Sequence, residues 1–223
     1  MSINVAIDGP AGAGKSTIAK RVAKEKGYIY VDTGAMYRAM ALYFIRQGIG
    51  ADEEEKINVA CKDADISIAY EDGVQVVLLN GENVNGLIRT ERVGNMASAT
   101  SVFCDVRKKL VELQQKLASK ENVVMDGRDI GTVVLPEAEV KVYLTASSAE
   151  RARRRFLELQ AKGENADIVQ IEKDIVERDH RDMTREISPL KQADDAVLVD
   201  SSDMSIEEVV NKIMSIINAA ENN

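Results

Sequence analysis

The sequence predicts an α/β fold, a five-stranded parallel sheet between two layers of helices, and two observations support this prediction. Five short apolar runs recur along the chain, and helical stretches lie between them. The runs are mostly continuous stretches of apolar residues, interrupted only by Asn4 and Lys141, as expected for parallel strands that are buried on both faces. We therefore expect strands near residues 4–7, 28–31, 123–125, 140–144 and 196–199.

Helices follow from the same alternation. We expect one helix from about Lys15 to Lys26 and a longer one from about Ala35 to Arg46. Two later helices should begin with capping boxes, in which a serine oxygen accepts from a free backbone amide and a glutamate three residues later bonds back. These boxes span residues 147–150 and 205–208.

One segment breaks the alternation of strands and helices. Residues 66–70 alternate between apolar and polar side chains, residues 74–79 form a second strand-like run, and Asp72-Gly73 and Asn80-Gly81 follow these two runs. Such dipeptides are the usual signal of tight hairpin turns. The sequence therefore predicts a small antiparallel β insert beside the main sheet.

Composition narrows the function. The 223 residues carry a formal net charge of −8, and an acidic protein lacks the basic face that non-specific nucleic-acid binding needs. No segment is apolar for long enough to span a bilayer, and no signal-peptide-like run precedes the first strand. We expect a cytoplasmic protein that acts as a monomer, without nucleic-acid, membrane or obligate protein partners.

The two cysteines and the one histidine are not expected to carry chemistry. Cys61 and Cys104 lack the spacing of a metal site and are expected to be free and buried. His180 lies among charged residues, which favours a solvated helix position over a ligand or a base.

Residues 9–16, Gly-Pro-Ala-Gly-Ala-Gly-Lys-Ser, fit the G-x-x-x-x-G-K-[ST] pattern of a phosphate-binding loop. Its glycines let successive backbone amides point at phosphate oxygens, Lys15 adds positive charge at the β- and γ-phosphates, and Ser16 offers a hydroxyl to Mg²⁺. A glycine-rich turn without a nucleotide is the alternative, but the pattern lies between a predicted strand and a predicted helix, the context that the function requires. The expected fold is therefore of the P-loop NTPase type, and we expect the ATP phosphates to contact Gly9, Pro10, Ala11, Gly12, Ala13, Gly14, Lys15, Ser16 and Thr17.

Asp126 is the candidate carboxylate on the magnesium side. It ends the apolar run at residues 123–125, and ligands of parallel sheets gather at the carboxyl ends of the strands. Ser16 would bind Mg²⁺ directly, and Asp126 would bind it through a water molecule. The alternative is that Asp126 only forms the turn before Gly127.

A phosphate-binding loop fits either an enzyme or a nucleotide-dependent switch. The Asn-Lys-x-Asp guanine reader of GTPases does not occur in the sequence. Transfer to a small acceptor should instead leave a second set of residues that bind anions and hydroxyl groups. The chain offers such a set: Arg38, Arg107, Arg128, Arg178, Arg181 and Arg185, with Asp129 and Asp182.

Four segments resemble the motifs of the bacterial cytidylate kinases, at residues 8–16, 32–38, 126–134 and 178–185. The resemblance covers essentially the whole chain, and the β insert is similar to that of the long form of the family. Thr33 stands where a serine occurs in some members and Ser16 where some have glycine, and both keep or add a hydroxyl. The resemblance implies transfer of the γ-phosphoryl group of ATP to CMP and dCMP, with Mg²⁺, in pyrimidine nucleotide metabolism. Another small-molecule P-loop kinase is the alternative.

The resemblance also implies how the acceptor is bound. Arg38 and Arg128 would hold the acceptor phosphate, and arginine suits a dianion because its guanidinium binds bidentately. Ser98, Arg107 and Asp129 would read the cytosine edge, where a carboxylate suits the amino group and a guanidinium the acceptors. The alternatives are a surface ion pair for Arg38 and a solvated helix face for Arg107.

Contacts to the sugar are implied for Thr33, Arg178 and Asp182. A short helical lid would close over the donor phosphates, and its arginines would neutralise charge on the transferring group. The sequence does not distinguish inward from exposed side chains among Arg151, Arg153, Arg154 and Arg155. We expect the transferring group to be stabilised by Lys15, Arg128, Arg185 and Arg153.

The resemblance also implies that the chain is a single kinase unit with three functional parts. The core is expected at about residues 1–37, 101–150 and 186–223. The lobe that binds the nucleoside monophosphate, with its β insert, is expected at about 38–100. The lid and its following helix take about 151–185.

Overall fold

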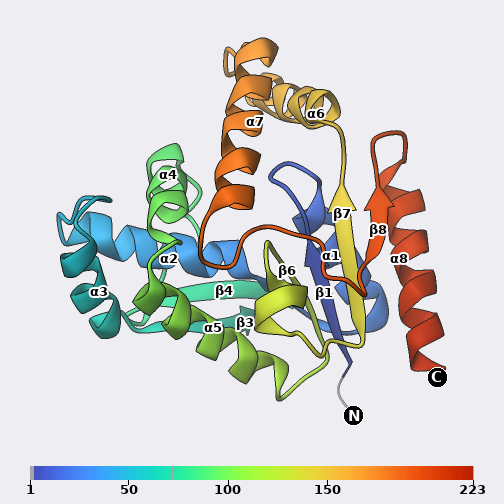
Figure 1. Cartoon of the computed structure of the whole chain (residues 1–223), viewed down its shortest axis with the longest axis horizontal. Coiled ribbons are helices and arrows are strands. Elements are labelled where there is room, and N and C mark those ends of the chain that lie inside the picture. Colours follow the sequence, from blue (N-terminus) through green and yellow to red (C-terminus); the bar gives the residue numbers. More distant parts are fainter. Residues whose placement is uncertain (1–2, 72, 223) are drawn as a thin grey trace. The chain divides into compact units, whose positions relative to one another are not determined.

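The computed structural model describes residues 3–71 and 73–222, and Figure 1 shows its helices and strands. The chain forms two compact units. The first unit consists of the residues up to Tyr30 and those from Asn122 onward, and the second of Val31–Glu121. Among the described residues, no helix has both the length and the apolar character that crossing a bilayer requires.

A five-stranded parallel sheet organises the first unit, in the order β2-β6-β1-β7-β8. All five predicted strands are present, so the predicted α/β class with a parallel sheet is confirmed. Most of them extend past the apolar run into the polar residue that follows it. Their bounds are Asn4–Asp8 for β1, Ile29–Asp32 for β2, Val123–Gly127 for β6, Val140–Thr145 for β7 and Val197–Asp200 for β8.

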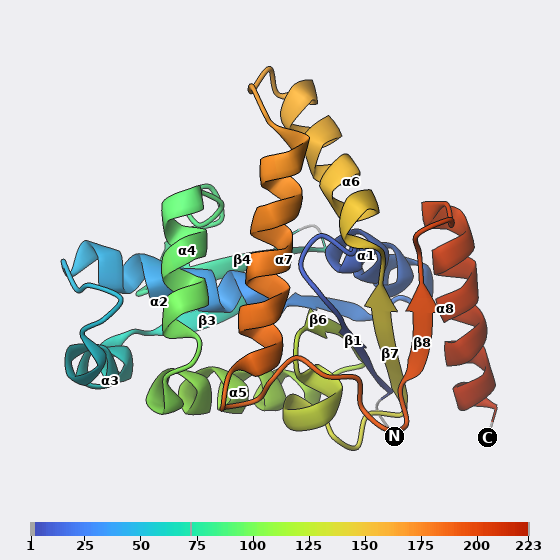
Figure 2. The ribbon, with the colours of Figure 1, turned by 45° about the horizontal axis from the view of Figure 1, so that its top comes forward.

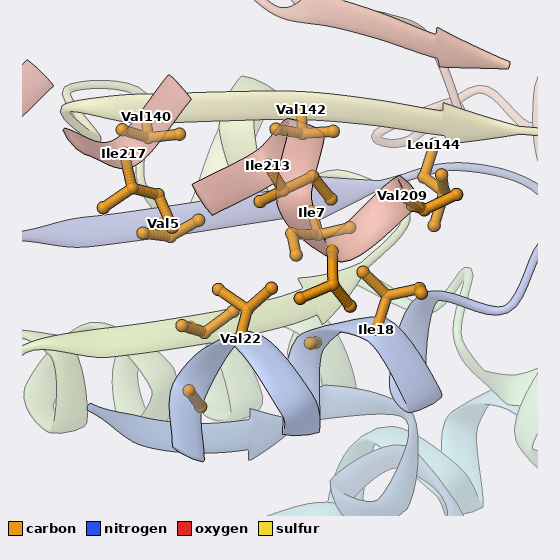
Figure 3. Close-up of a cluster of buried hydrophobic side chains, with 14 of the residues drawn as sticks. Val5, Ile7, Ile18, Val22, Val140, Val142, Leu144, Val209, Ile213 and Ile217 are labelled. Atoms are coloured by element: carbon orange, nitrogen blue, oxygen red, sulfur yellow. The ribbon is translucent and has the colours of Figure 1, made fainter. Parts of the chain in front are cut away.

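The core of the first unit holds two helices on one face of this sheet. Helices α1 (Lys15–Lys26) and α8 (Ile206–Glu221) direct apolar side chains onto β1 and β7. Figure 3 shows Ile18 and Val22 of α1 and Ile213 of α8 around Ile7. Burying this cluster fixes the amino end of α1 beside the carboxyl ends of the strands, which is where the phosphate-binding loop lies.

Helices α6 (Ser148–Ala161) and α7 (Ile168–Thr184) pack against each other in the first unit (Figure 2). Ser147 caps α6 by accepting from the amide of Glu150 at 3.2 Å. The predicted capping box is only half formed, because the Glu150 carboxylate pairs with Arg153 and Arg154 instead of bonding back. At the start of α8 the predicted box is complete.

The second unit contains the predicted β insert. Strands β3 (Ile66–Glu71) and β4 (Val74–Leu79) pair antiparallel, and a short third strand, β5 (Glu82–Asn83), adds to β4. Gly73 and Gly81 have positive φ, as the predicted turns require, while Asp72 lies outside the described residues. The helices of this unit are α2 (Thr33–Arg46), α3 (Glu54–Asp63), α4 (Glu91–Thr100) and α5 (Cys104–Ala118).

One prediction about the cysteines is wrong. Cys61 is free and buried as expected, but Cys104, also free, is exposed. Cys104 is the first residue of α5, and the buried stripe of that helix begins only at Val106. His180 is exposed on α7, as expected.

The two packing units are not the three functional parts expected from the sequence. Helix α5, whose residues were assigned to the core, packs on α2 and α3 within the second unit. The division into core, acceptor-binding lobe and lid describes substrate binding rather than packing, and it stays a prediction.

Candidate active site

The phosphate-binding loop connects β1 to α1 at residues 9–14. Gly9, Gly12 and Gly14 have φ of 148°, 76° and 86°, in the region that favours glycine. A β-carbon on Gly9 would also collide with the carbonyl oxygen of Leu144. No side chain caps the start of α1, so its first amides remain available to an anion.

Lys15 lies inside this loop with 6% of its surface exposed. Its Nζ donates to the carbonyl oxygen of Pro10 at 2.8 Å. Burial lowers the pKa of Lys15 well below its ordinary value, and the positive charge of Arg128 lowers it further, while Asp126 and Asp8 act in the opposite direction. Lys15 is thus a buried cation that feels a second positive charge, an arrangement that favours a bound anion.

The predicted magnesium ligands lie next to each other. The Ser16 hydroxyl donates to Oδ2 of Asp126 at 2.9 Å, and the hydroxyl of Tyr30 donates to Oδ1 of the same carboxylate at 2.8 Å. A hydroxyl and a carboxylate are the hard oxygen ligands that Mg²⁺ prefers. In the described part of the chain no cluster of three or more metal-binding side chains occurs. These residues therefore fit an ion that takes its other ligands from phosphate and water.

Sequence reasoning missed Tyr30. It is a buried residue of β2, and its contact with Asp126 depends on β2 and β6 being neighbours in the sheet. Its signal in the sequence is a hydroxyl group between the apolar residues Ile29 and Val31.

Two predicted acceptor-binding segments meet within the first unit. Arg128 follows β6 and pairs through Nε with Oδ2 of Asp182 on α7, at 3.0 Å. Asp129 is buried, and its Oδ1 lies 3.6 Å from Nη2 of Arg185, which follows α7. Arg178 is half-buried one turn before Asp182 on the same helix. These five predicted residues thus lie in the segment after β6, in the second half of α7 and directly after that helix.

The four lid arginines differ in position. Arg151 is buried: it donates to the carbonyl oxygen of Ala11 in the phosphate-binding loop at 2.9 Å, and it pairs with Asp179 of α7 at 2.7 Å. Arg154 lies beside Gly14, since a β-carbon there would be 3.9 Å from its Nη1.

The other two lid arginines lie on the exposed face of α6. The side chain of Arg153, the one singled out from the sequence, is 58% exposed and pairs with Glu150. Arg155 pairs with Glu158.

The second unit holds the remaining predicted residues. Thr33 is buried at the first position of α2, and Arg38 is half-buried with its Nη1 beside Gly34. Arg107 is 5% exposed and its guanidinium lies 5.9 Å from the ring centre of Tyr37. The alternative of a solvated helix face is therefore wrong for Arg107.

Ser98 is half-buried on α4, and its carbonyl oxygen accepts from the hydroxyl of Ser101. The carbonyl oxygen of Ser101 in turn accepts from Arg107, at 3.4 Å. Ser98 and Arg107, both predicted to read the base, are thus linked through one short segment.

A glycine loop at the carboxyl end of β1, a buried lysine inside it, and a serine hydroxyl bonded to the carboxylate at the end of β6 define a P-loop nucleotide-binding protein. The family model described as cytidylate kinase matches residues 5–219. The chain therefore belongs to the cytidylate kinase family.

Curated relatives agree over nearly their whole length. The cytidylate kinase of Caldicellulosiruptor saccharolyticus is 52% identical over 214 residues, covering 96% of this chain and 95% of that protein. The cytidylate kinase of Lactobacillus johnsonii is 50% identical over 221 residues, covering 99% of this chain and 96% of that protein.

More distant solved structures share the fold. A gluconokinase from Sinorhizobium meliloti has a TM-score of 0.50 at 15% identity, over 99% of this chain and 94% of that one. An uncharacterized protein from Eubacterium ventriosum has a TM-score of 0.55 at 12% identity, over 98% of this chain and 99% of that one. At these identities the likeness concerns the fold alone.

Proposed function

We infer that this chain transfers the γ-phosphoryl group of ATP to CMP, giving CDP and ADP, and so serves pyrimidine nucleotide metabolism. Membership of the cytidylate kinase family over residues 5–219 supports this activity. The observation that carries it is the pairing of β1 with β6, in which Asp8, directly before the phosphate-binding loop, is the register partner of Gly127, directly before Arg128. The loop for the donor phosphates and a residue for the acceptor phosphate thus follow neighbouring strands.

In this reaction an oxygen of the CMP phosphate attacks the γ-phosphorus, and the bond to the β-phosphate oxygen of ATP breaks. The loop amides and Lys15 bind the β- and γ-phosphates, and Arg38, Arg128 and Arg185 bind the acceptor phosphate and the transferring group. Mg²⁺ held by Ser16 and, through water, by Asp126 would supply further positive charge to the donor phosphates. No covalent protein intermediate is needed, because positioning and charge stabilisation suffice.

Base and sugar contacts are proposed as the sequence predicted them. Ser98, Arg107 and Asp129 read the cytosine edge, and burial suits Arg107 and Asp129 to this task because hydrogen bonds to charged groups strengthen away from water. The sugar is bound by Thr33, Arg178 and Asp182. We propose dCMP as a second acceptor and a monomer as the active unit.

The sequence predicts that Arg153 stabilises the transferring group, and Arg154 is the alternative among the proposed lid arginines. Both pair with Glu150, but only Arg154 lies beside the phosphate-binding loop. Arg151 is committed to a loop carbonyl and to Asp179, which suits it to hold the loop in place.

The test is a coupled assay of ADP release against a panel of nucleoside monophosphates, with shikimate as a non-nucleotide acceptor. We expect slow ADP release without an acceptor, strong stimulation by CMP and dCMP, weaker stimulation by UMP, and none by shikimate. EDTA should abolish the reaction and Mg²⁺ restore it. Equal ADP release with and without every acceptor would contradict the proposal and favour an ATPase or a switch.

A further inference from the structure

Asp8 is the last residue of β1 and directly precedes the phosphate-binding loop. Its side chain is buried, and 5% of the residue is exposed. Oδ1 accepts from the backbone amide of Ile130 at 2.8 Å, and Oδ2 accepts from the amide of Gly131 at 2.7 Å. The Asp8 carboxylate thus ties the end of β1 to a segment more than a hundred residues later in the sequence.

These two amides begin the π-type turn η1 (Ile130–Val134), which directly follows Arg128 and Asp129. The first amides of a helical turn have no carbonyl partner within it, so they need an outside acceptor. Asp129 itself has φ −144° and ψ 28°, outside the helical region, and its side chain does not cap the turn. The Asp8 carboxylate therefore supplies the cap that the local sequence lacks.

Both ends of the segment that carries Arg128 and Asp129 are fixed to Asp8. At one end, Gly127 is the register partner of Asp8 in the parallel pairing of β1 with β6. At the other end stand the two carboxylate hydrogen bonds. The approach is close: a β-carbon on Gly131 would lie 3.5 Å from Oδ2 of Asp8 and 3.2 Å from Cδ of Lys141. Two residues between two anchors have little freedom to move.

We propose that Asp8 is a positioning residue for CMP binding: by capping η1 it holds Arg128 and Asp129 in the orientation that the acceptor requires. This rests on the proposed roles of Arg128 and Asp129. Both carboxylate oxygens of Asp8 accept from backbone amides, so we assign Asp8 an indirect effect. Burial raises the pKa of Asp8, so keeping the ionised carboxylate in this position is unfavourable. A side chain needed only for packing could be apolar.

The variant Asp8→Asn keeps the shape of the side chain but has one acceptor oxygen instead of two. Its amide group would face a backbone N–H, so that two donors oppose each other. We expect the dissociation constant for CMP, measured by calorimetry without ATP, to rise about tenfold, as for the loss of a hydrogen bond to a charged group. The dissociation constant for ADP should not rise, because removing the negative charge of Asp8 leaves Lys15 at least as attractive to the donor phosphates.

A matched control separates positioning from stability. Asn122 also accepts from a backbone amide in the first unit, that of Ile3 at 2.7 Å, but at the amino end of β6. Asn122→Ala and Asp8→Asn should both lower the melting temperature, and only Asp8→Asn should weaken CMP binding. If Asp8→Asn does not fold, Asp8→Ser, which is smaller and keeps one acceptor oxygen without an amide group, tests the same contact with the same expected change in CMP affinity.

CMP binding by single and double variants distinguishes a failure of this inference from a failure of the proposed roles of Arg128 and Asp129. If Asp129→Asn and Arg128→Lys bind CMP like the wild type, the roles of Arg128 and Asp129 are wrong. If those variants weaken CMP binding but Asp8→Asn does not, or if Asp8→Asn weakens CMP and ADP equally, the inference about Asp8 is overturned. In the double variant of Asp8→Asn and Asp129→Asn, we expect a loss smaller than the product of the single losses. Fully multiplied losses would show that Asp8 does not act through Asp129.

Discussion

The phosphate-binding loop and the acceptor-binding residues of the first unit are built in opposite ways. The loop is contiguous, and backbone amides and positive-φ glycines at residues 9–14 create its shape. The residues proposed to bind the acceptor are dispersed, and side-chain pairs such as Arg128 with Asp182 and Asp129 with Arg185 orient them. A site made of backbone depends on local sequence, whereas a site made of side-chain pairs depends on which elements the fold brings together. Changes in the two regions should therefore differ in size and in selectivity.

The largest effect is expected in the loop. Lys15→Met should lower kcat by roughly a thousandfold for every acceptor, since Lys15 meets charge that develops on the donor phosphates. The fold should not suffer, because burial already opposes the charge of Lys15 in the wild type. Steady-state kinetics and a thermal melt of the same sample check both points. A variant that keeps most of its turnover would show that the loop does not take part in the transfer.

A selective effect is expected from Asp129→Asn. In the proposed complex the wild-type carboxylate would accept from the amino group of cytosine, while uracil presents an oxygen at that position. Losing this charge-assisted bond should cost about 1.5–3 kcal/mol, roughly ten- to a hundred-fold in kcat/KM for CMP. Asparagine can turn a donor toward uracil, so the preference for CMP over UMP should narrow, while Arg107 keeps it from reversing. Equal losses for CMP and UMP would show that Asp129 does not read the base.

A smaller effect separates two neighbouring lid arginines. Arg153→Ala and Arg154→Ala each remove one positive charge and one partner of Glu150, and Arg154→Ala also removes two hydrogen bonds to Ser201, whose effect on stability a thermal melt measures separately. The position of Arg154 beside Gly14 leads us to expect about a tenfold loss of kcat from Arg154→Ala, as for a charged hydrogen-bond donor. The loss from Arg153→Ala should be smaller. The reverse order of the two losses would restore Arg153, the residue proposed from the sequence.

The last effect concerns stability and its dependence on pH rather than catalysis. Burial raises the pKa of Asp8 from 3.8 to about 6. Because the folded-state pKa lies above the unfolded one, protonation favours the folded state, and this contribution is lost as the pH rises from about 4 to about 6. The free energy of unfolding of the wild type, minus that of Asp8→Asn, should therefore fall across this range, by at most about 1.4 kcal/mol per pH unit. Denaturant titrations at several pH values check this; a difference that stays constant or rises contradicts the burial effect.

The same contrast explains what the sequence could predict. The strands, α1, the β insert and the phosphate-binding loop follow from local patterns, and all of them are present in the structure. The contact of Tyr30 with Asp126 and the burial of Arg107 against Tyr37 join segments that local patterns treat separately. The Glu150 side chain shows the same limit: its capping box is a local pattern, but arginines one turn along α6 compete for the carboxylate. Competition of this kind depends on side-chain orientation, which spacing alone does not determine.

The central claim is that the loop and the acceptor-binding residues serve one direct transfer from ATP to CMP. ATP labelled in its γ-phosphate, incubated with CMP and Mg²⁺, tests it most directly when the products are separated. We expect the label to appear in CDP in the same amount as the ADP formed, and Lys15→Met to abolish it. Label released as inorganic phosphate, with no labelled CDP, would contradict the account.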